Sequence, residues 1–280
     1  MRANPRTGAL SRRAATLWML PASRIVCLSA ESAEVLAVLG QSSRIAGVTA
    51  FAPRSAGLAE KPRVAAFSTA KLERILALEP DLVIAWSDVQ ADMAAALIRA
   101  GCNVLVTTQR TVEQILDTIL LLGAVAGADR AAQALVAELR AHLEDCRRCA
   151  EELPARPGVW FEEWMDPLIS GIGWVQDLIE IAGGRPLFPE LRHRWRAADR
   201  VVDPTEVARR NPELILASWC GRRVRTDTIR ARAGWDGTAA VRAGRIHEIR
   251  SHLILQPGIT ALRDGLAELR RLIAAAAQVR

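Results

Sequence analysis

The sequence of 280 residues contains no tyrosine and almost no lysine. All of its aromatic side chains are therefore Trp (8 residues) or Phe (4 residues). Among 37 basic residues only Lys61 and Lys71 are lysine, and the arginines are scattered, often beside acidic residues, without a long basic run. The net charge of +6 thus indicates an arginine-rich, solvated surface rather than a nucleic-acid-binding face.

Long apolar runs and a regular cysteine spacing are also missing. No run reaches the roughly 18 residues that are needed to span a bilayer. The five cysteines form an odd and irregular set, which argues against a disulfide framework. Cys146 and Cys149 share a helix face and would supply half of a metal site, but no second pair or nearby histidine completes it. We interpret them as ordinary thiols.

The sequence has none of the common nucleotide-binding or catalytic motifs. It contains no P-loop, no complete dinucleotide-binding glycine pattern, no nucleophile elbow and no zinc-protease motif. Its histidines are too dispersed to indicate a metal cluster. One enzymatic hypothesis, a hydrolase or chelatase, rests on Glu162, Glu163 and Asp166. Adjacent strand residues point to opposite faces, so at most one of the two glutamates faces a cleft, and we predict a protein that is not an enzyme.

The N-terminus has some features of an export signal. Arg12-Arg13 precede a short apolar segment that ends at Ala22, in the order typical of a secretory or twin-arginine signal. The apolar core is at the lower length limit, and Leu20 is unfavourable for cleavage after Ala22. We therefore expect residues 1–23 to be an N-terminal extension or a weak signal, and an exported and a leaderless cytoplasmic protein both stay open.

From residue 24 onward, short β-branched runs alternate with helical stretches. This alternation predicts parallel βαβ units and an α/β fold. The expected strands are 25–28, 45–48, 82–85, 104–106, 159–161, 214–217 and 246–249. The expected helices include 32–39, 72–78, 91–100, a helix capped by Thr111, and a last helix over 259–275.

A long segment without Gly or Pro divides the chain into two similar halves. Apolar residues recur at helical spacing over 128–153, which predicts one long helix. The segment 73–86, a helix followed by Pro80, an acid and a strand, is similar to 206–219, which has the same order around Pro212. We therefore predict an N-terminal α/β lobe over 24–127, a bridging helix over 128–153 and a C-terminal α/β lobe over 154–280, with mainly parallel sheets in both lobes.

Several aromatic residues follow strands directly, where loops of α/β proteins form ligand crevices. They are Phe51, Phe67, Trp86, Trp164, Trp195 and Trp219. Such rings supply large, stiff apolar contact area to a bulky ligand. The alternative is that individual rings fill the cores of the lobes.

On these motifs the sequence resembles the helical-backbone substrate-binding proteins of ABC importers, which capture cobalamin, ferric siderophores and haem. The likeness is closest to the cobalamin-binding members and covers about residue 24 to the C-terminus. It rests on 24–34 with Gly40, 72–86, 167–171, 182–184, and 203–206 with Pro212. These motifs together are more specific for the fold than for the ligand.

The resemblance implies roles for particular residues. A corrinoid such as cobalamin would be the transported ligand, with no cofactor, held in an inter-lobe cleft. Phe51, Phe67, Trp164 and Leu168 match ligand-contacting segments, to which we add Trp86, Trp195 and Trp219. His252 falls in a loop with polar ligand contacts, and a metal-binding role for it is a minor alternative. Glu73 and Glu206 match the acidic residues that dock onto permease arginines; the alternative is an exposed glutamate stabilised by its helix dipole.

The resemblance also implies an interaction partner and a location, and it leaves alternative ligands open. We expect a monomer that delivers its ligand to the permease subunits of an ABC importer, from a periplasmic or membrane-associated extracytoplasmic position. A ferric siderophore or haem is the second ligand hypothesis, since Arg54, Arg194, Arg196 and Arg222 are available for an anionic ligand. If residues 1–22 are not a signal, a leaderless cytoplasmic corrinoid-binding protein is the alternative.

Overall fold

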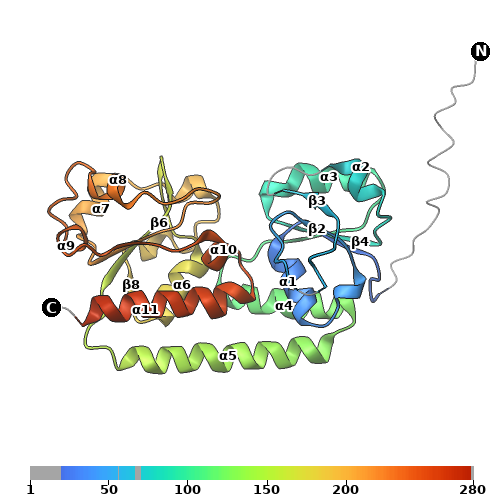
Figure 1. The fold of residues 1–280 in the computed structure, drawn as a ribbon, viewed down its shortest axis with the longest axis horizontal. Helices are drawn as coiled ribbons and strands as arrows, with labels where there is room; N and C mark the ends of the chain where they lie inside the picture. Colours follow the sequence, from blue (N-terminus) through green and yellow to red (C-terminus); the bar gives the residue numbers. More distant parts are fainter. Residues whose placement is uncertain (1–19, 56, 67–70, 279–280) are drawn as a thin grey trace, which may run out of the picture. The chain divides into compact units, whose positions relative to one another are not determined.

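A computed structural model describes residues 20–55, 57–66 and 71–278 (Figure 1). Contacts divide the chain into two compact units. The first comprises Met1–Thr108 and Ile119–Gln133, and the second comprises Gln109–Thr118 and Ala134–Arg280. Phe67 lies outside the described residues, as does nearly all of the N-terminal segment whose signal character the sequence left open.

The first unit is built on a parallel five-stranded sheet. In sheet order its strands are β3 (Arg63–Ala65), β2 (Ile45–Thr49), β1 (Ile25–Cys27), β4 (Leu82–Trp86) and β5 (Val104–Thr107). Its shorter helices are α1 (Ala30–Val38), α2 (Leu72–Leu76) and α3 (Ala91–Arg99). The central strands β1 and β4 are almost fully buried, as expected for a parallel sheet. The sequence predicted β1, β2, β4 and β5 but not the short β3.

The second unit has a mixed sheet in which the parallel pairs dominate. The strands follow the order β10 (Ile246–Glu248), β9 (Leu214–Ala217), β6 (Gly158–Met165) and β7 (Leu168–Ser170), and β8 (Arg185–Pro186) also pairs with β6. Only β7 is antiparallel to its neighbour β6 among these pairs. The α/β class with mainly parallel sheets is therefore confirmed. The β6–β7 hairpin was not predicted. The sequence suggested a strand over 159–161 only, whereas β6 continues to Met165 and turns at Asp166 and Pro167 into β7.

Helices and a tryptophan-rich core complete the second unit. The helices are α6 (Gly173–Ile181), α7 (Pro204–Arg209), α8 (Thr226–Arg230), α9 (Ala239–Arg242), α10 (Ser251–Ile254) and α11 (Leu266–Ala277), the last entered through a π-helical turn η5 (Ala261–Gly265). Trp160 and Trp235 are fully buried. The Trp160 ring meets Phe188 edge-on at 5.4 Å, and Trp235 Nε1 donates to the Pro204 carbonyl at 3.0 Å. Burying such rings supplies much of the core's stabilisation.

Two longer helices, α4 (Val112–Ala126) and α5 (Asp129–Glu151), each have residues in both units. Thr111 caps α4 as predicted, because its Oγ1 accepts the Gln114 N–H at 3.2 Å. The single long helix expected over 128–153 corresponds to α5, whose Leu139 and Leu143 are buried. Within the second unit, Arg270 of α11 donates to the Cys146 Sγ of α5 at 3.5 Å. No described helix combines the length and apolar character needed to cross a bilayer.

Gly171 and Gly173, which flank Ile172, both have a packing role. Gly173 is the first residue of α6, and a Cβ there would collide with the carbonyl oxygens of Arg110 and Arg192. A side chain at Gly171 would press on Phe161. Gly173 therefore allows two backbone segments to approach α6 closely, and Gly171 makes room for the Phe161 ring. The pair serves packing and is not part of a nucleotide-binding motif, whose third glycine the sequence lacks.

Candidate functional site

The carboxyl ends of β6 and β9 border a cavity of ≈ 470 Å³ in the second unit. Ligands of α/β sheets bind at this edge, because the loops that follow parallel strands gather there. Met165 is the last residue of β6, Asp166 follows it, and Trp219 comes two residues after β9. The remaining lining residues lie between the end of β9 and the residues just after α8. They are Thr228 and four arginines: Arg222, Arg223, Arg225 and Arg232.

A buried carboxylate anchors one wall of this cavity. Glu162 is 0% exposed and accepts from three side chains. The indole Nε1 atoms of Trp160 and Trp219 lie 3.2 and 3.1 Å from its oxygens. The Arg232 guanidinium donates to both carboxylate oxygens, at 2.8 Å through Nη2. Both oxygens of this buried carboxylate accept hydrogen bonds, and these bonds hold the Trp219 ring and the Arg232 side chain in place.

Its sequence neighbour Glu163 serves a separate network on the other face of the strand. Its oxygens accept from the buried guanidinium of Arg200 at 2.6 and 2.9 Å, and one of them also accepts the Ile172 N–H at 2.9 Å. Glu162 and Glu163 therefore act as acceptors in two different ion pairs. The geometry gives no shared carboxylate pair for the acid–base hypothesis.

The predicted aromatic ligand contacts of the second unit occupy three different environments. Trp195 is 54% exposed between the short turns η3 (Pro189–Leu191) and η4 (Ala197–Arg200). Trp164 is half-buried, and the Arg222 guanidinium lies 5.5 Å from its ring centroid. Trp219 and Leu168 are only 3% and 4% exposed and belong to the core. Trp219 therefore follows the alternative that the sequence left open, a ring that fills the core, because it bonds to Glu162. Leu168 is buried because β7 pairs with β6.

In the first unit, the predicted contacts follow two strands of the parallel sheet. Phe51 comes two residues after β2 and is 54% exposed. Trp86 is the last residue of β4 and is half-buried. Its backbone N–H donates to Gln90 Oε1 at 2.9 Å. Both residues therefore lie at the carboxyl edge of the first sheet, where the sequence predicted them.

The residues predicted for docking or polar contact are all at the surface, with different partners. His252 is exposed on α10, and Glu73 is exposed on α2. Glu206 on α7 accepts from Arg209 at 2.6 Å and from Arg210 at 2.7 Å. These hydrogen bonds lower the pKa of Glu206 to about 2. The arginines that follow Glu206 in the sequence were the available signal for this pairing.

Of the arginines considered for an anionic ligand, only Arg222 lines the cavity. Arg54 and Arg194 are exposed elsewhere, and Arg196 forms an ion pair with Asp199 at 3.0 Å. Sequence reasoning missed Arg223, Arg225 and Arg232. Their signal was the density of arginine in 222–232, just after a predicted strand.

The paired thiols of α5 have a histidine neighbour that the sequence reasoning overlooked. His142 lies one helical turn before Cys146, with its Nε2 3.8 Å from the Cys146 Sγ. Cys146 is buried, which raises the pKa of its thiol. No group of three or more metal-ligating side chains occurs among the residues that the structure describes.

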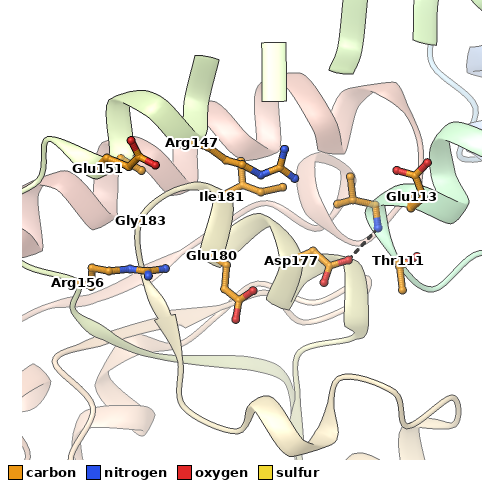
Figure 2. Close-up of a pocket in the computed structure, with 11 residues that line it drawn as sticks. Thr111, Glu113, Arg147, Glu151, Arg156, Asp177, Glu180, Ile181 and Gly183 are labelled. Carbon is orange, nitrogen blue, oxygen red and sulfur yellow. Dashed lines mark hydrogen bonds between the residues drawn. The ribbon is translucent and has the colours of Figure 1, made fainter. Parts of the chain in front are cut away.

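A second cavity of the same unit, of ≈ 430 Å³, is lined by residues of α4, α5 and α6 (Figure 2). Its lining is largely charged and contains no aromatic ring. Asp177 accepts the Val112 N–H at 2.9 Å and so holds the first turn of α4, while burial raises the pKa of this carboxyl. Because it lacks apolar rings and its best-placed carboxylate is used as a helix cap, this cavity suits a macrocyclic ligand less well than the one beside Trp219.

Comparison with known proteins identifies the family. A model of the periplasmic binding protein family matches residues 25–253. The chain therefore belongs to the periplasmic binding protein family, whose members are substrate-binding proteins.

Similar characterised proteins carry names that specify a ligand. The chain is 29% identical over 210 residues to the vitamin B12-binding protein of Salmonella typhimurium, covering 72% of this chain and 74% of that protein. It is 27% identical over 201 residues to the vitamin B12-binding protein of Vibrio campbellii, covering 71% of each.

Solved structures with the same fold bind different macrocycles. The periplasmic vitamin B12 binding protein BtuF of Vibrio cholerae has a TM-score of 0.73 at 21% identity, over 92% of this chain and 99% of that one. The periplasmic haem-binding protein RhuT of Roseiflexus sp. RS-1 has a TM-score of 0.78 at 22% identity, over 91% and 99%. These likenesses show the fold.

Proposed function

We propose that this protein captures a corrinoid of the cobalamin type and delivers it to an ABC importer. The observation that carries the proposal is the match to vitamin B12-binding proteins over about seven tenths of the chain. It is supported by exposed or half-buried rings at the carboxyl edges of both sheets, Phe51 and Trp86 in the first unit and Trp164 in the second. Apolar contact over a macrocycle supplies most of the affinity in such a site, and no catalytic group is required.

Isothermal titration of the purified protein with cyanocobalamin tests the proposal. We expect saturable heat with one ligand per chain at micromolar concentrations or below. Phe51→Ala, Trp86→Ala and Trp164→Ala should each weaken binding, whereas Val38→Ala, an exposed apolar residue on α1, is the matched control. Absence of heat at tens of micromolar cyanocobalamin would reject the corrinoid assignment.

Haem is the second candidate ligand, favoured by the haem-binding structural relatives and by the arginines of the Trp219 cavity. Guanidinium groups suit the carboxylates of haem or of an anionic siderophore. Absorbance titrations with haem and with a ferric chelate separate these ligands from a corrinoid, since each changes its own visible spectrum on binding.

For transport, we propose that Glu73 and Glu206 dock onto arginines of the permease subunits. The exposed position of Glu73 and the surface ion pairs of Glu206 support this role, since an exchange of arginine partners leaves the Glu206 charge compensated. A Glu73→Ala, Glu206→Ala double variant should bind ligand normally and lose uptake in cells. Unimpaired uptake would contradict the docking role.

Delivery to an importer requires an extracytoplasmic position, which we propose on the basis of the family. A mass measurement of the protein from its native cells tests this, because removal of the N-terminal segment marks export. Retention of the whole chain in the cytoplasmic fraction would instead favour a cytoplasmic corrinoid-binding role.

A further inference from the structure

The cavity beside Trp219 carries an excess of fixed positive charge. Two of its four arginines already have acidic partners: Arg232 pairs with Glu162, and Arg225 lies 3.4 Å from Asp227. Arg222 and Arg223 form no ion pair among the residues that the structure describes. They share the cavity with one exposed carboxylate, Asp166. Two guanidiniums against one carboxylate leave a cationic site.

The wall of this cavity is preorganised. Arg232 is tied to a carboxylate that is itself fixed by the Trp160 and Trp219 indoles. Arg222 lies over the face of Trp164, a stacked arrangement that leaves the edge of a guanidinium available for hydrogen bonds. Apolar ring surface and free donors therefore adjoin one another, which matches a ligand with a flat apolar body and an anionic arm.

We propose that this cavity binds the anionic oxygen group of the macrocyclic ligand, with Arg222 and Arg223 as its donors. The inference rests on the proposed function and adds which part of the ligand the second unit recognises. For a corrinoid the group is the phosphodiester of the nucleotide loop, and for haem it is a propionate carboxylate. Arginine binds both groups through parallel N–H donors, and its charge does not vary over the physiological pH range.

The test compares cyanocobalamin with dicyanocobinamide, which lacks the nucleotide loop and its phosphodiester. Both ligands are titrated calorimetrically into the wild type and into an Arg222→Gln, Arg223→Gln variant. We expect the wild type to prefer cyanocobalamin, and the variant to weaken cyanocobalamin binding about 10- to 100-fold with little change for dicyanocobinamide. Added salt should weaken cyanocobalamin binding more in the wild type than in the variant.

Arg230→Gln is the matched control, since Arg230 is exposed at the end of α8 and does not line the cavity. Its binding of both ligands should equal that of the wild type. Denaturation midpoints of all variants show that they are folded. Equal loss of both ligands in the double variant, or no loss of either, would overturn the inference while leaving the corrinoid function in place.

A second pair of probes distinguishes the source of the anionic group. If the wild type binds neither corrinoid, the corrinoid function fails, and haem is compared with its dimethyl ester. If the wild type binds the ester more weakly than haem, while the double variant binds both equally, the cavity is the binding site of the haem carboxylates. Equal binding of haem and ester by the wild type, or binding of neither, overturns the inference.

Discussion

The segments 73–86 and 206–219 repeat one structure with different surroundings. In each, a short helix is followed within three residues by a residue with positive φ that precedes a proline, Glu79 (φ 47) before Pro80 and Asn211 (φ 50) before Pro212. The following acid then holds the start of the neighbouring strand. Asp81 accepts the N–H groups of Ser23 and Arg24, just before β1, and Glu213 accepts the Gly158 N–H at the start of β6. The shared Pro-acid motif is therefore structural in both units.

The two units differ in how they treat a buried glutamate. Glu31, on α1 just after β1, is 6% exposed, and its Oε1 has no hydrogen-bond partner among the described residues. Burial raises the pKa of Glu31 to about 7. Glu162 in the second unit is equally buried but is bound by Arg232 and two indoles. A buried carboxylate is therefore kept charged where a cation and enough donors surround it, as at Glu162, and has a raised pKa where they do not, as at Glu31.

The largest expected effect removes the charge of the partnered glutamate. Glu162→Gln leaves Arg232, whose side chain is only 18% exposed, without its counter-ion. We expect a loss of about 3–5 kcal/mol in the free energy of unfolding, measured by urea denaturation. Asp166→Asn, an exposed carboxylate on the same strand end, is the control and should change little. A loss below about 1 kcal/mol for Glu162→Gln would refute this account of the buried pair.

Neutralising Glu31, which forms no ion pair among the described residues, should instead stabilise the protein. The pKa of Glu31 is about 7 in the folded protein and 4.5 when unperturbed, so the folded state holds an extra proton between these pH values. Stability should therefore fall as pH rises from about 4.5 to 7. Glu31→Gln, which stays neutral, should be more stable than the wild type by up to about 3 kcal/mol at pH 8, with little difference at pH 4.5.

Thermal unfolding of both proteins at the two pH values measures this effect. Asp92→Asn, an exposed acidic residue in the first turn of α3, serves as the control for a simple loss of helix charge. A stability difference between Glu31→Gln and wild type that does not change with pH would contradict the raised pKa.

A smaller effect distinguishes the two Pro-acid motifs. Asp81 accepts three hydrogen bonds, from the Ser23 N–H, the Ser23 hydroxyl and the Arg24 N–H, whereas Glu213 accepts one from Gly158. Partial burial would raise the pKa of Asp81, but these bonds outweigh it and lower the pKa. We expect Asp81→Asn to lose about 1–2 kcal/mol of stability and Glu213→Gln about half as much. Equal losses in urea denaturation would show that the number of accepted bonds does not decide the effect.

The smallest effect concerns the exposed ion pairs of Glu206. Arg209→Gln removes one of the two donors that lower its pKa to about 2, so the pKa should rise toward the ordinary value of 4.5. A carbon-detected NMR titration of the Glu206 carboxyl measures this pKa. Arg242→Gln, on α9, is the control variant. Because the site is exposed, the denaturation midpoint should stay unchanged. An unchanged pKa would mean that Arg210 alone holds the carboxylate.

The regular parts of both units were predictable because their signals are local. Short β-branched runs and period-3.6 patterns gave β1, β2, β4, β5, β9 and most helices within a few residues, and Gly40 and Gly101 mark helix ends through their positive φ. The short β3, β7 and β8 were missed. Length alone does not explain this, since β1 also has three residues; β1 consists of apolar residues only, whereas β3 and β8 begin with an arginine and β7 ends in a serine. The turn at Asp166-Pro167 looks the same in sequence whether it ends a strand or begins a hairpin.

Candidate site residues were predictable only in part. The expectation that aromatic residues follow strands places Phe51 two residues after β2, whereas Trp164 lies within β6, near its carboxyl end; both are at or near the surface. The same rule could not separate them from Trp219, whose burial depends on Glu162, 57 positions away along the chain. The pairing of Arg232 with Glu162 spans 70 positions and has no local signature at all.

The sequence by itself determined the α/β class, the repeated Pro-acid segment and the family, because these depend on short-range patterns and on motifs read along the chain. Only the tertiary structure decided which tryptophans form the core and which buried glutamate pairs with an arginine. It also decided that Arg222 and Arg223 enter one cavity without acidic partners among the described residues. The physical reason is that burial and charge pairing are set by neighbours in space, and those neighbours come from strands and loops that are distant in sequence.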